Sequence, residues 1–198
     1  MRIITIGSCI GIDIVKLSNF GWKLEKNFTS YSPFAILEGL SNSINLPEYI
    51  LSDVNKELGE RLRYNFNGQI MNDAKQINPD IVLVDLIDLR IPVDVFELSN
   101  GNTITMTHCS IDGTIFDRIK DFIEVSLSCK IVNVKNISFS SLPQAKKADI
   151  VRRFIQLLWD TFGQKKVIFF KPRLVNQFID SNSISGRMIK YTENFKIS

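Results

Sequence analysis

MRIITIGSCIGID, residues 1–13, joins a β-branched run to a turn of small residues and then to an apolar, periodic segment. Residues 2–6 are short and rich in isoleucine, which predicts a buried strand. Residues 11–20 place apolar side chains close to helical spacing, so a short helix is expected there. A strand that turns directly into a helix is typical of α/β proteins, whose ligands bind beyond the carboxyl ends of the strands.

The rest of the chain alternates apolar runs with amphipathic segments. The run IVLVDLI, within residues 78–90, has the continuous apolar character of a central parallel strand. Asn100 and Gly101 separate two β-prone runs and predict a hairpin. Ser32 is expected to be the N-cap of a helix that has Pro33 in its first turn. Further helices are expected at residues 31–40, 47–66, 115–127 and 142–162 and from residue 174, and further strands at 93–98, 102–107, 130–134 and 165–173. This alternation predicts a single α/β domain over residues 1–198, with a mainly parallel sheet.

The composition is that of a soluble globular protein, with 198 residues, 44% hydrophobic and 23% charged. No apolar run reaches the roughly 20 residues that cross a bilayer, and no signal-peptide cleavage site follows the first strand. The three cysteines have no CxxC spacing, which argues against a disulfide framework or a zinc knuckle. Cys109 and Cys129 are expected to be inert thiols, and a single histidine, His108, excludes a zinc site built from several histidines. We therefore expect a cytoplasmic protein without a metal site.

Charge is distributed unevenly along the chain, although the net charge is only +3. Residues 1–99 contain 9 Lys and Arg against 13 Asp and Glu, whereas residues 100–198 contain 15 against 8. A basic half of this kind can attract a phosphate-bearing ligand or nucleic acid. The basic residues are scattered, however, and those around residues 145–160 fit the solvated face of a helix. Because no nucleic-acid recognition motif accompanies them, no nucleic-acid partner is expected.

Gly7, Ser8 and Cys9 form the turn after the first strand and are the first candidates for chemistry. Gly7 permits a tight exit from the strand. A helix that starts near Gly11 points its free N–H groups back at the turn, where they can stabilise an oxyanion. Cys9, or Ser8 with the help of a base, is then a candidate nucleophile. The alternative is an ordinary tight turn that holds a small hydroxyl and a buried thiol.

Polar residues also follow the later strands of the predicted sheet, as DLIDLR at its third strand and KPR, residues 171–173, at its fourth. A carboxylate inside an apolar strand is costly unless it is paired, and Arg90 is close enough in sequence to pair with Asp85 or Asp88. The structural interpretation is a buried ion pair, and the functional one is a carboxylate that orients a base or binds substrate. His108 is the one candidate for a general base, although a lone histidine is more often structural.

The first strand followed by Gly-x-Ser/Cys resembles the opening block of the SGNH (GDSL-type) hydrolases. Their motif is Gly-Asp-Ser, with the serine as nucleophile, so the resemblance places Gly7 at the glycine, Ser8 at the aspartate and Cys9 at the nucleophile. More closely, the chain resembles an uncharacterised bacterial SGNH-like family found near capsule and polysaccharide genes. Its GSCVSRD-like motif is matched by the turn together with Asp13, and its DLIDER-like motif by residues 85–90. The turn is also similar to the Gly-Asn-Cys of a capsule-biosynthesis group whose cysteine lies in a coenzyme-A-binding, acyl-transfer pocket.

The chain departs from these patterns at several positions. Ile12 stands where the closer family has Arg, and Leu89 stands where it has Glu. The Gly-x-Asn-Asp block of the superfamily is missing, and so is the Asp-x-x-His block of its last segment, since residues 187–198 read RMIKYTENFKIS. Two explanations are open: the chain is truncated at its C-terminus, or it has lost catalysis. Without that histidine, the nucleophile has no partner base unless His108 takes the role.

The resemblance implies a flavodoxin-like, three-layer α/β/α sandwich of the SGNH type, with acyl-ester chemistry on a glycan, either acetyl transfer or deacetylation. Cys9 or Ser8 would attack the acyl carbonyl. The residues implied to shape the pocket or bind substrate are Gly7, Asp13, Asp85, Asp88 and Arg90. No cofactor is required, apart from an acyl donor such as acetyl-CoA. A second hypothesis is a glycan-binding or assembly protein that uses the same pocket without turnover. Phosphate or nucleotide binding by the basic half is a third, which the absence of a Gly-rich phosphate loop disfavours.

Overall fold

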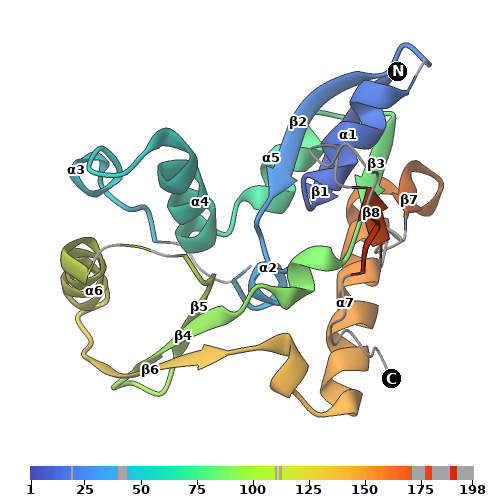
Figure 1. The fold of residues 1–198 in the computed structure, drawn as a ribbon. Coiled ribbons are helices and arrows are strands. Elements are labelled where there is room, and N and C mark those ends of the chain that lie inside the picture. The colour runs from blue at the N-terminus through green and yellow to red at the C-terminus, as the bar shows by residue number, and fades with distance from the viewer. Residues whose placement is uncertain are drawn as a thin grey trace.

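The fold was obtained as a computed structural model that describes residues 1–18, 20–39, 44–109, 111, 113–170, 177–179 and 188–190. The strands are β1 (Arg2–Gly7), β2 (Lys23–Thr29), β3 (Ile81–Val84), β4 (Val93–Leu98), β5 (Thr103–Thr107), β6 (Ile131–Ile137), β7 (Val167–Phe169), β8 (Gln177–Ile179) and β9 (Met188–Lys190). The α-helices are α1 (Ile10–Leu17), α2 (Pro33–Gly39), α3 (Glu48–Leu51), α4 (Lys56–Asn67), α5 (Ile70–Gln76), α6 (Gly113–Leu127) and α7 (Gln144–Phe162). Short 3-10 helices are η1 (Ile87–Arg90), η2 (Phe139–Ser141) and η3 (Gln164–Lys166). Figure 1 shows β1, β2, β3 and α1 on one side of the molecule, α3, α4 and α6 on the other, and α2 between them.

Four strands form a parallel sheet in the order β2-β1-β3-β7. β1 and β3 are its central strands, and side chains such as Ile4 and Val82 are fully buried because both faces of these strands are covered. Since the strands are parallel, the turns that follow β1, β2 and β3 lie along one edge of the sheet. The prediction of parallel strands at residues 2–6 and within residues 78–90 is confirmed.

Two predictions about this sheet are wrong. The run IVLVDLI does not continue as a strand to residue 87. Instead β3 ends at Val84, because the Asp85 side chain is tied to the turn after β1, and η1 follows. The strand predicted to be buried at residues 165–173 is β7, which pairs only with β3 among the described strands, and its Ile168 is 43% exposed. The apolar runs thus predicted that β3 and β7 exist, but they did not predict where β3 ends or that β7 is partly exposed.

Helices cover both faces of the parallel sheet. On one face, α1 packs Val15 against Ile3 of β1 and Leu83 of β3. On the other face, α2, α5 and α7 form the larger core, in which Phe154 of α7 is fully buried. The four-residue spacing of Ile150, Phe154 and Leu158 that predicts α7 is therefore the spacing of the residues that it buries.

Two predictions about helices need correction. Residues 47–66 do not form one helix, since α3 and α4 are separated by a turn. The side chain of Asn55 accepts a 2.9 Å hydrogen bond from the Leu58 amide and starts α4, so this cap overrides the continuous apolar spacing. α2 does start at Pro33, but the Ser32 hydroxyl does not cap it. The Ser32 backbone oxygen accepts the first helical bond, from Ile36, while the buried hydroxyl has no partner among the residues that the structure describes.

A separate antiparallel sheet has the strand order β5-β4-β6. The predicted hairpin is its β4-β5 pair, and Gly101 in the turn has a φ of 85°, which glycine adopts without strain. α3, α4 and α6 pack against this sheet in a second core that includes the fully buried Phe96, Ile119 and Ile123. The α/β class is therefore confirmed, with strands that divide between a parallel and an antiparallel sheet.

The predicted helix from residue 174 is wrong where the structure describes the chain. β8 and β9 pair there as a two-stranded antiparallel ribbon. β-branched and aromatic residues such as those in residues 177–179 favour a strand, and apolar spacing over only a few residues does not separate a helix from a strand. Within the described ranges, no helix has the length and apolar character needed to cross a membrane.

Candidate functional site

The turn after β1 approaches the end of β3 so closely that only glycine fits at its first position. Gly7 has a φ of 129°, and a Cβ added to it would lie 2.7 Å from the Asp85 backbone oxygen and 2.8 Å from Oδ1 of the Asp85 side chain. Both the backbone conformation and the contact exclude a larger residue. The sequence prediction that Gly7 permits a tight exit from β1 agrees with this geometry.

Ser8 and Asp85 are brought together by the parallel pairing of β1 with β3. The Ser8 amide donates a 3.0 Å hydrogen bond and the Ser8 hydroxyl a 2.8 Å hydrogen bond to Oδ2 of Asp85. Oδ1 of the same carboxylate accepts a 3.0 Å bond from the Ile87 amide at the start of η1. Ser8 and Asp85 are 6% and 2% exposed, so this is a buried carboxylate satisfied by three donors. It fixes the turn to the neighbouring strand end.

Cys9 is the exposed member of the turn. It occupies the N-cap position of α1, and its backbone oxygen accepts bonds of 3.0 Å from the Ile12 amide and 3.4 Å from the Asp13 amide. Its thiol makes no capping bond. Asp13 is exposed in the first turn of α1. Cys9 therefore presents a solvent-accessible thiol at the carboxyl edge of the parallel sheet, whereas the Ser8 hydroxyl is buried and bound to Asp85.

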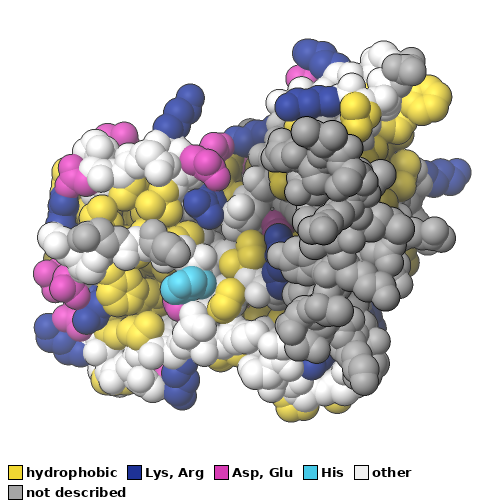
Figure 2. All heavy atoms as spheres, viewed as in Figure 1, with side chains coloured by type: hydrophobic (Ala, Val, Ile, Leu, Met, Phe, Trp, Pro, Cys, Tyr) yellow, Lys and Arg dark blue, Asp and Glu magenta, His cyan; other side chains and the backbone are white. Residues whose placement is uncertain are grey.

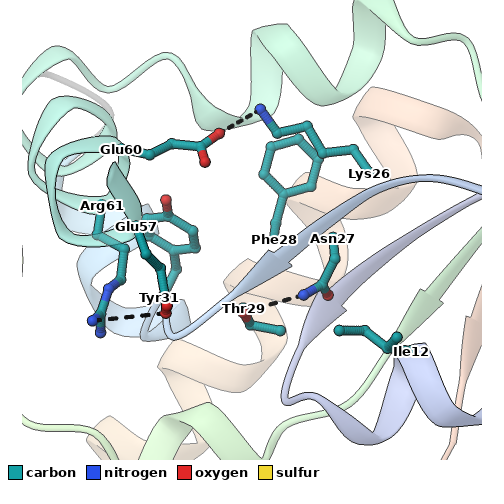
Figure 3. A pocket seen from close by; sticks show the side chains of 9 residues that line it. All are labelled: Ile12, Lys26, Asn27, Phe28, Thr29, Tyr31, Glu57, Glu60 and Arg61. Atoms are coloured by element: carbon teal, nitrogen blue, oxygen red, sulfur yellow. Dashed lines mark hydrogen bonds and ion pairs between the residues drawn. The ribbon is translucent and has the colours of Figure 1, made fainter. Parts of the chain in front are cut away.

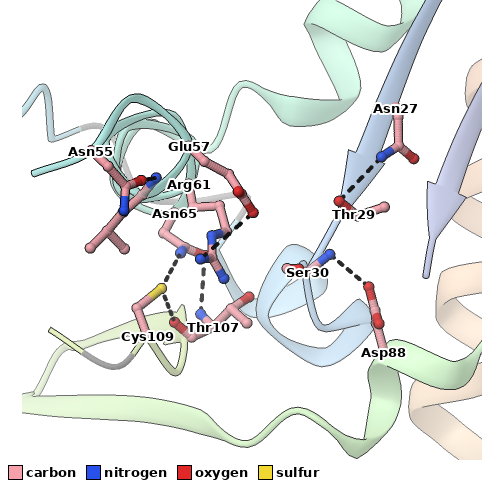
Figure 4. A network of polar contacts seen from close by, with 11 residues as sticks. Asn27, Thr29, Ser30, Asn55, Glu57, Arg61, Asn65, Asp88, Thr107 and Cys109 are labelled. Atoms are coloured by element: carbon pink, nitrogen blue, oxygen red, sulfur yellow. Dashed lines mark hydrogen bonds and ion pairs between the residues drawn. The ribbon is translucent and has the colours of Figure 1, made fainter. Parts of the chain in front are cut away.

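Asp88 holds the loop that follows β2. Its Oδ2 accepts a 2.8 Å hydrogen bond from the amide of Ser30, a non-glycine residue with a φ of 65° (Figure 4). Asp88 is 3% exposed, and desolvation by burial raises its pKa to about 6. The nearby Asp85 charge adds to this increase, while the Ser30 amide opposes it. A carboxyl that titrates near neutral pH thus lies one turn of η1 beyond Asp85.

The structural interpretation of this segment, a buried ion pair with Arg90, is wrong. Arg90 is exposed, and among the described residues it makes no ion pair with Asp85, Asp88 or any other carboxylate. The Asp85 carboxylate is instead satisfied by hydrogen bonds from Ser8 and Ile87. The bonds from Ser8 could not be predicted from the sequence, because Ser8 is remote from Asp85 along the chain. Arg90 influences the pKa of Asp88 only through its charge.

His108 lies in the antiparallel sheet, just after β5. Its Nδ1 is 2.8 Å from Oδ2 of Asp94 in β4, and Oδ1 of Asp94 accepts a 2.8 Å bond from Asn136. Asp94 is 8% exposed, whereas the His108 side chain is 44% exposed, and Figure 2 shows the histidine on the visible face. In the described part of the chain, no hydrogen bond or ion pair joins His108 to Ser8 or Cys9. Sequence reasoning did not include Asp94, which the hairpin register alone places beside His108.

A polar network between α4 and β5 contains the second cysteine. The side-chain oxygen of Asn65 accepts a 3.0 Å bond from the Thr107 amide, and the Cys109 thiol donates to the Thr107 oxygen at 3.4 Å (Figure 4). Cys109 is 5% exposed, and burial raises the pKa of its thiol to about 11. These contacts fit the prediction of an inert thiol at this position.

A cleft of about 360 Å³ lies between the carboxyl end of β2 and α4 (Figure 3). Its lining residues are Ile12, Lys26, Asn27, Phe28, Thr29, Tyr31, Glu57, Glu60 and Arg61. Sequence reasoning missed this cleft, because the charges of α4 have the spacing of an ordinary solvated helix face. Ile12 belongs to α1, so the cleft borders the helix that starts at Cys9.

Within the described ranges, no group of three or more His, Cys, Asp or Glu side chains could hold a metal ion. Residues 171–173, which were predicted to bring polar groups to the same sheet edge, lie outside the described residues. Comparisons of the chain with protein-family models, with curated proteins and with solved structures found no match. The function is therefore inferred from the geometry of the residues themselves.

Proposed function

We propose that this chain transfers an acyl group through a thioester on Cys9. The donor would be an ester or thioester such as acetyl-CoA, and the acceptor a glycan hydroxyl or, in hydrolysis, water. The observation that carries the proposal is the contrast within one turn. Ser8 is buried and bound to Asp85 by two hydrogen bonds, and Cys9 next to it is exposed at the start of α1. A thiol on a fixed turn at the carboxyl edge of a parallel sheet is positioned for attack on a bound carbonyl.

The start of α1 supplies groups that suit the negative charge of such a reaction. Among the described residues, the Cys9 amide has no hydrogen-bond acceptor, and the Ile10 amide has only a long, 3.4 Å contact with the Ser8 hydroxyl. The positive end of the helix dipole lies at the same place. Backbone amides held in this way stabilise the oxyanion of a tetrahedral intermediate without moving.

The reaction has two balanced steps. In the first, the Cys9 sulfur forms a bond with the acyl carbon, the bond from that carbon to the donor oxygen or sulfur breaks, and the thiol proton passes to the departing group. In the second, an acceptor hydroxyl or water attacks the thioester, the carbon–sulfur bond breaks, and the acceptor proton returns to the thiolate. His108 is the base that we propose for these proton transfers. The described contacts pair it with Asp94 and do not join it to Cys9.

The proposal extends to the surroundings of the reaction. We infer a flavodoxin-like, three-layer sandwich of the SGNH type, supported by a parallel sheet with helices on both faces. We also propose a role in the assembly of a surface polysaccharide, on the resemblance of its GSC and DLIDLR motifs alone. A cytoplasmic location is proposed because unpaired cysteines fit a reducing compartment.

The test is the mass of the intact chain after incubation with acetyl-CoA and, separately, with p-nitrophenyl acetate. We expect one acetyl group per chain, located on Cys9 by peptide mapping and removed by added glycan or by water. Cys9→Ala should abolish the adduct, whereas Cys129→Ala, a matched change at a half-buried cysteine of the second core, should retain it. An adduct that persists in Cys9→Ala, or its absence from the unchanged chain with both donors, contradicts the proposal.

A second candidate function is glycan binding or assembly without turnover. The observation that favours it is the separation of the polar pairs, since Ser8 is engaged by Asp85 and His108 by Asp94 on a different sheet. This candidate predicts binding of glycan fragments to a chain that forms no acyl adduct. Thus the same incubation, followed by a glycan-binding measurement, separates the two functions.

A further inference from the structure

The cleft between β2 and α4 contains one pair of charges that satisfy each other. Nζ of Lys26 is 2.7 Å from the Glu60 carboxylate (Figure 3). Nζ is also 3.0 Å from the Tyr64 hydroxyl, which in turn donates a 2.8 Å bond to Asp73. The Lys26 ammonium also lies 5.3 Å from the centre of the Phe28 ring. The charges of Lys26 and Glu60 are therefore already paired with each other, and neither requires a ligand as a partner.

Next to Glu60 on α4, Arg61 contributes a donor without an acceptor among the described residues. Nε of Arg61 is shielded from solvent and has no hydrogen-bond partner within the described ranges. The ion pair that the Arg61 guanidinium makes among the described residues is long, with 3.9 Å between Nη2 and the Glu57 carboxylate, and the Glu57 side chain is 76% exposed. A buried N–H group without an acceptor is unfavourable, and an exposed glutamate at this distance is easily displaced.

The same cleft contains a second donor, the Tyr31 hydroxyl, without an acceptor among the described residues. Tyr31 is 6% exposed, and in the described part of the chain its hydroxyl has no hydrogen-bond partner. Its ring packs edge-on against Tyr64, which fixes its direction. In Figure 3 the hydroxyl points toward the Glu60 side of the cleft, and the Arg61 guanidinium lies nearer the other end of the Tyr31 side chain. Burial raises the pKa of Tyr31 above its ordinary value of 10.0, so the group is a protonated donor at all ordinary pH values.

We propose that this cleft binds a small organic acid through one carboxylate, which accepts hydrogen bonds from the Arg61 guanidinium and the Tyr31 hydroxyl. A carboxylate would supply the acceptor that both donors lack, and the paired N–H groups of a guanidinium match the two carboxylate oxygens. A singly charged group is favoured over a phosphate dianion because Glu57 and Glu60 line the same cleft. A volume of about 360 Å³ suits a ligand of monosaccharide size. The inference does not depend on acylation of Cys9.

The test is a titration of the full chain with glucuronate, with glucose, with glucose 1-phosphate and with acetate, followed by amide NMR spectra. We expect glucuronate to shift the amide signals of the cleft residues, glucose to leave them unchanged, and glucose 1-phosphate to bind more weakly than glucuronate. Acetate, as the smallest carboxylate, should shift the same signals at higher concentration. The matched pair of glucuronate and glucose isolates the contribution of the carboxylate.

Three variants assign the binding to the proposed donors. Arg61→Gln should weaken glucuronate binding by about ten- to hundredfold, as expected for loss of a hydrogen bond to a charged group. Tyr31→Phe removes only the hydroxyl and keeps the ring contact, and it should weaken binding by about three- to tenfold. Arg63→Gln, a change on the same helix at an exposed arginine paired with Glu48, should leave the affinity unchanged.

Several results would overturn the inference. Equal binding of glucose and glucuronate would show that the carboxylate is not recognised, and stronger binding of glucose 1-phosphate would identify a phosphate site instead. Unchanged affinity for glucuronate in Tyr31→Phe, which retains the packing of the core, would show that the Tyr31 hydroxyl does not bind the ligand. If Arg63→Gln lost as much affinity for glucuronate as Arg61→Gln, the effect would come from the net charge of the chain and not from Arg61. If neither glucuronate nor acetate shifted the amide signals, the site would be excluded.

Discussion

Replacing Asp88 by asparagine should stabilise the chain near neutral pH. Burial raises the pKa of Asp88 from 3.8 to about 6, so the folded chain binds its proton more tightly than the unfolded chain does. Each pKa unit corresponds to about 1.4 kcal/mol, which gives a cost of about 3 kcal/mol for ionised Asp88. Asparagine avoids this cost and keeps one oxygen for the Ser30 amide, but it loses the stronger bond to a charged acceptor. The expected net gain is therefore about 1–3 kcal/mol at pH 8.

The pH dependence gives the prediction its sign. Because the folded pKa is raised, the contribution of Asp88 to stability is greatest below about pH 4 and decreases as the pH rises through about 6. The Asp88→Asn variant lacks this decrease. Urea unfolding curves, followed by tryptophan fluorescence at several pH values, would therefore show equal stabilities near pH 4 and a growing advantage of the variant up to pH 8.

A surface carboxyl provides the control. The Lys135 ammonium lowers the pKa of the partly exposed Glu97, so its contribution to stability is present above the unfolded pKa and is lost as the pH falls. Glu97→Gln should then show a pH trend of the opposite sign. If the Asp88→Asn difference were the same at pH 4 and pH 8, or if the variant were the less stable chain at pH 8, the assignment of Asp88 as a buried, destabilising carboxylate would be wrong.

Other predictions concern the turn after β1 and the cysteines. Gly7→Ala should lower the free energy of unfolding by about 2–3 kcal/mol in urea titrations, because its Cβ would collide with Asp85 at a positive φ. Ser8→Ala removes the hydroxyl bond to Asp85 and should cost about 1–3 kcal/mol in the same assay, with slower acylation of Cys9 by mass spectrometry. In the folded chain, iodoacetamide should label the exposed Cys9 well before Cys109, whose thiol is buried and has a pKa raised to about 11. Equal labelling of Cys109 in the folded chain would contradict that burial.

The sequence by itself determined the elements whose signals are local. Isoleucines at residues 2–6 and the continuous apolar run after residue 80 predicted the two central strands, because burial on both faces selects such runs. Asn100 and Gly101 predicted the hairpin, since few other residues adopt its turn, and the spacing of Ile150 and Phe154 predicted α7.

Part of the candidate site was also predictable. The small residues Gly7 and Ser8 and the buried position of Asp85 were each recognised from their neighbours along the chain. Their meeting follows from one further inference, that β1 and β3 are adjacent parallel strands whose carboxyl ends share an edge. The end of β3 at Val84 was missed, because hydrophobic periodicity does not report where a side chain bonds to a distant turn.

Only the tertiary structure decided which polar groups contact one another. Ser8 and Asp85 are 77 residues apart, and the register of β1 against β3 determines their hydrogen bonds. The packing of α4 beside β2 likewise leaves Nε of Arg61 without an acceptor, as far as the described residues go, in a cleft that Tyr31 also lines. Secondary structure follows from short-range preferences and periodic burial, which a sequence displays directly. A binding site depends instead on distances between remote side chains, which exist only once the sheets and helices have packed.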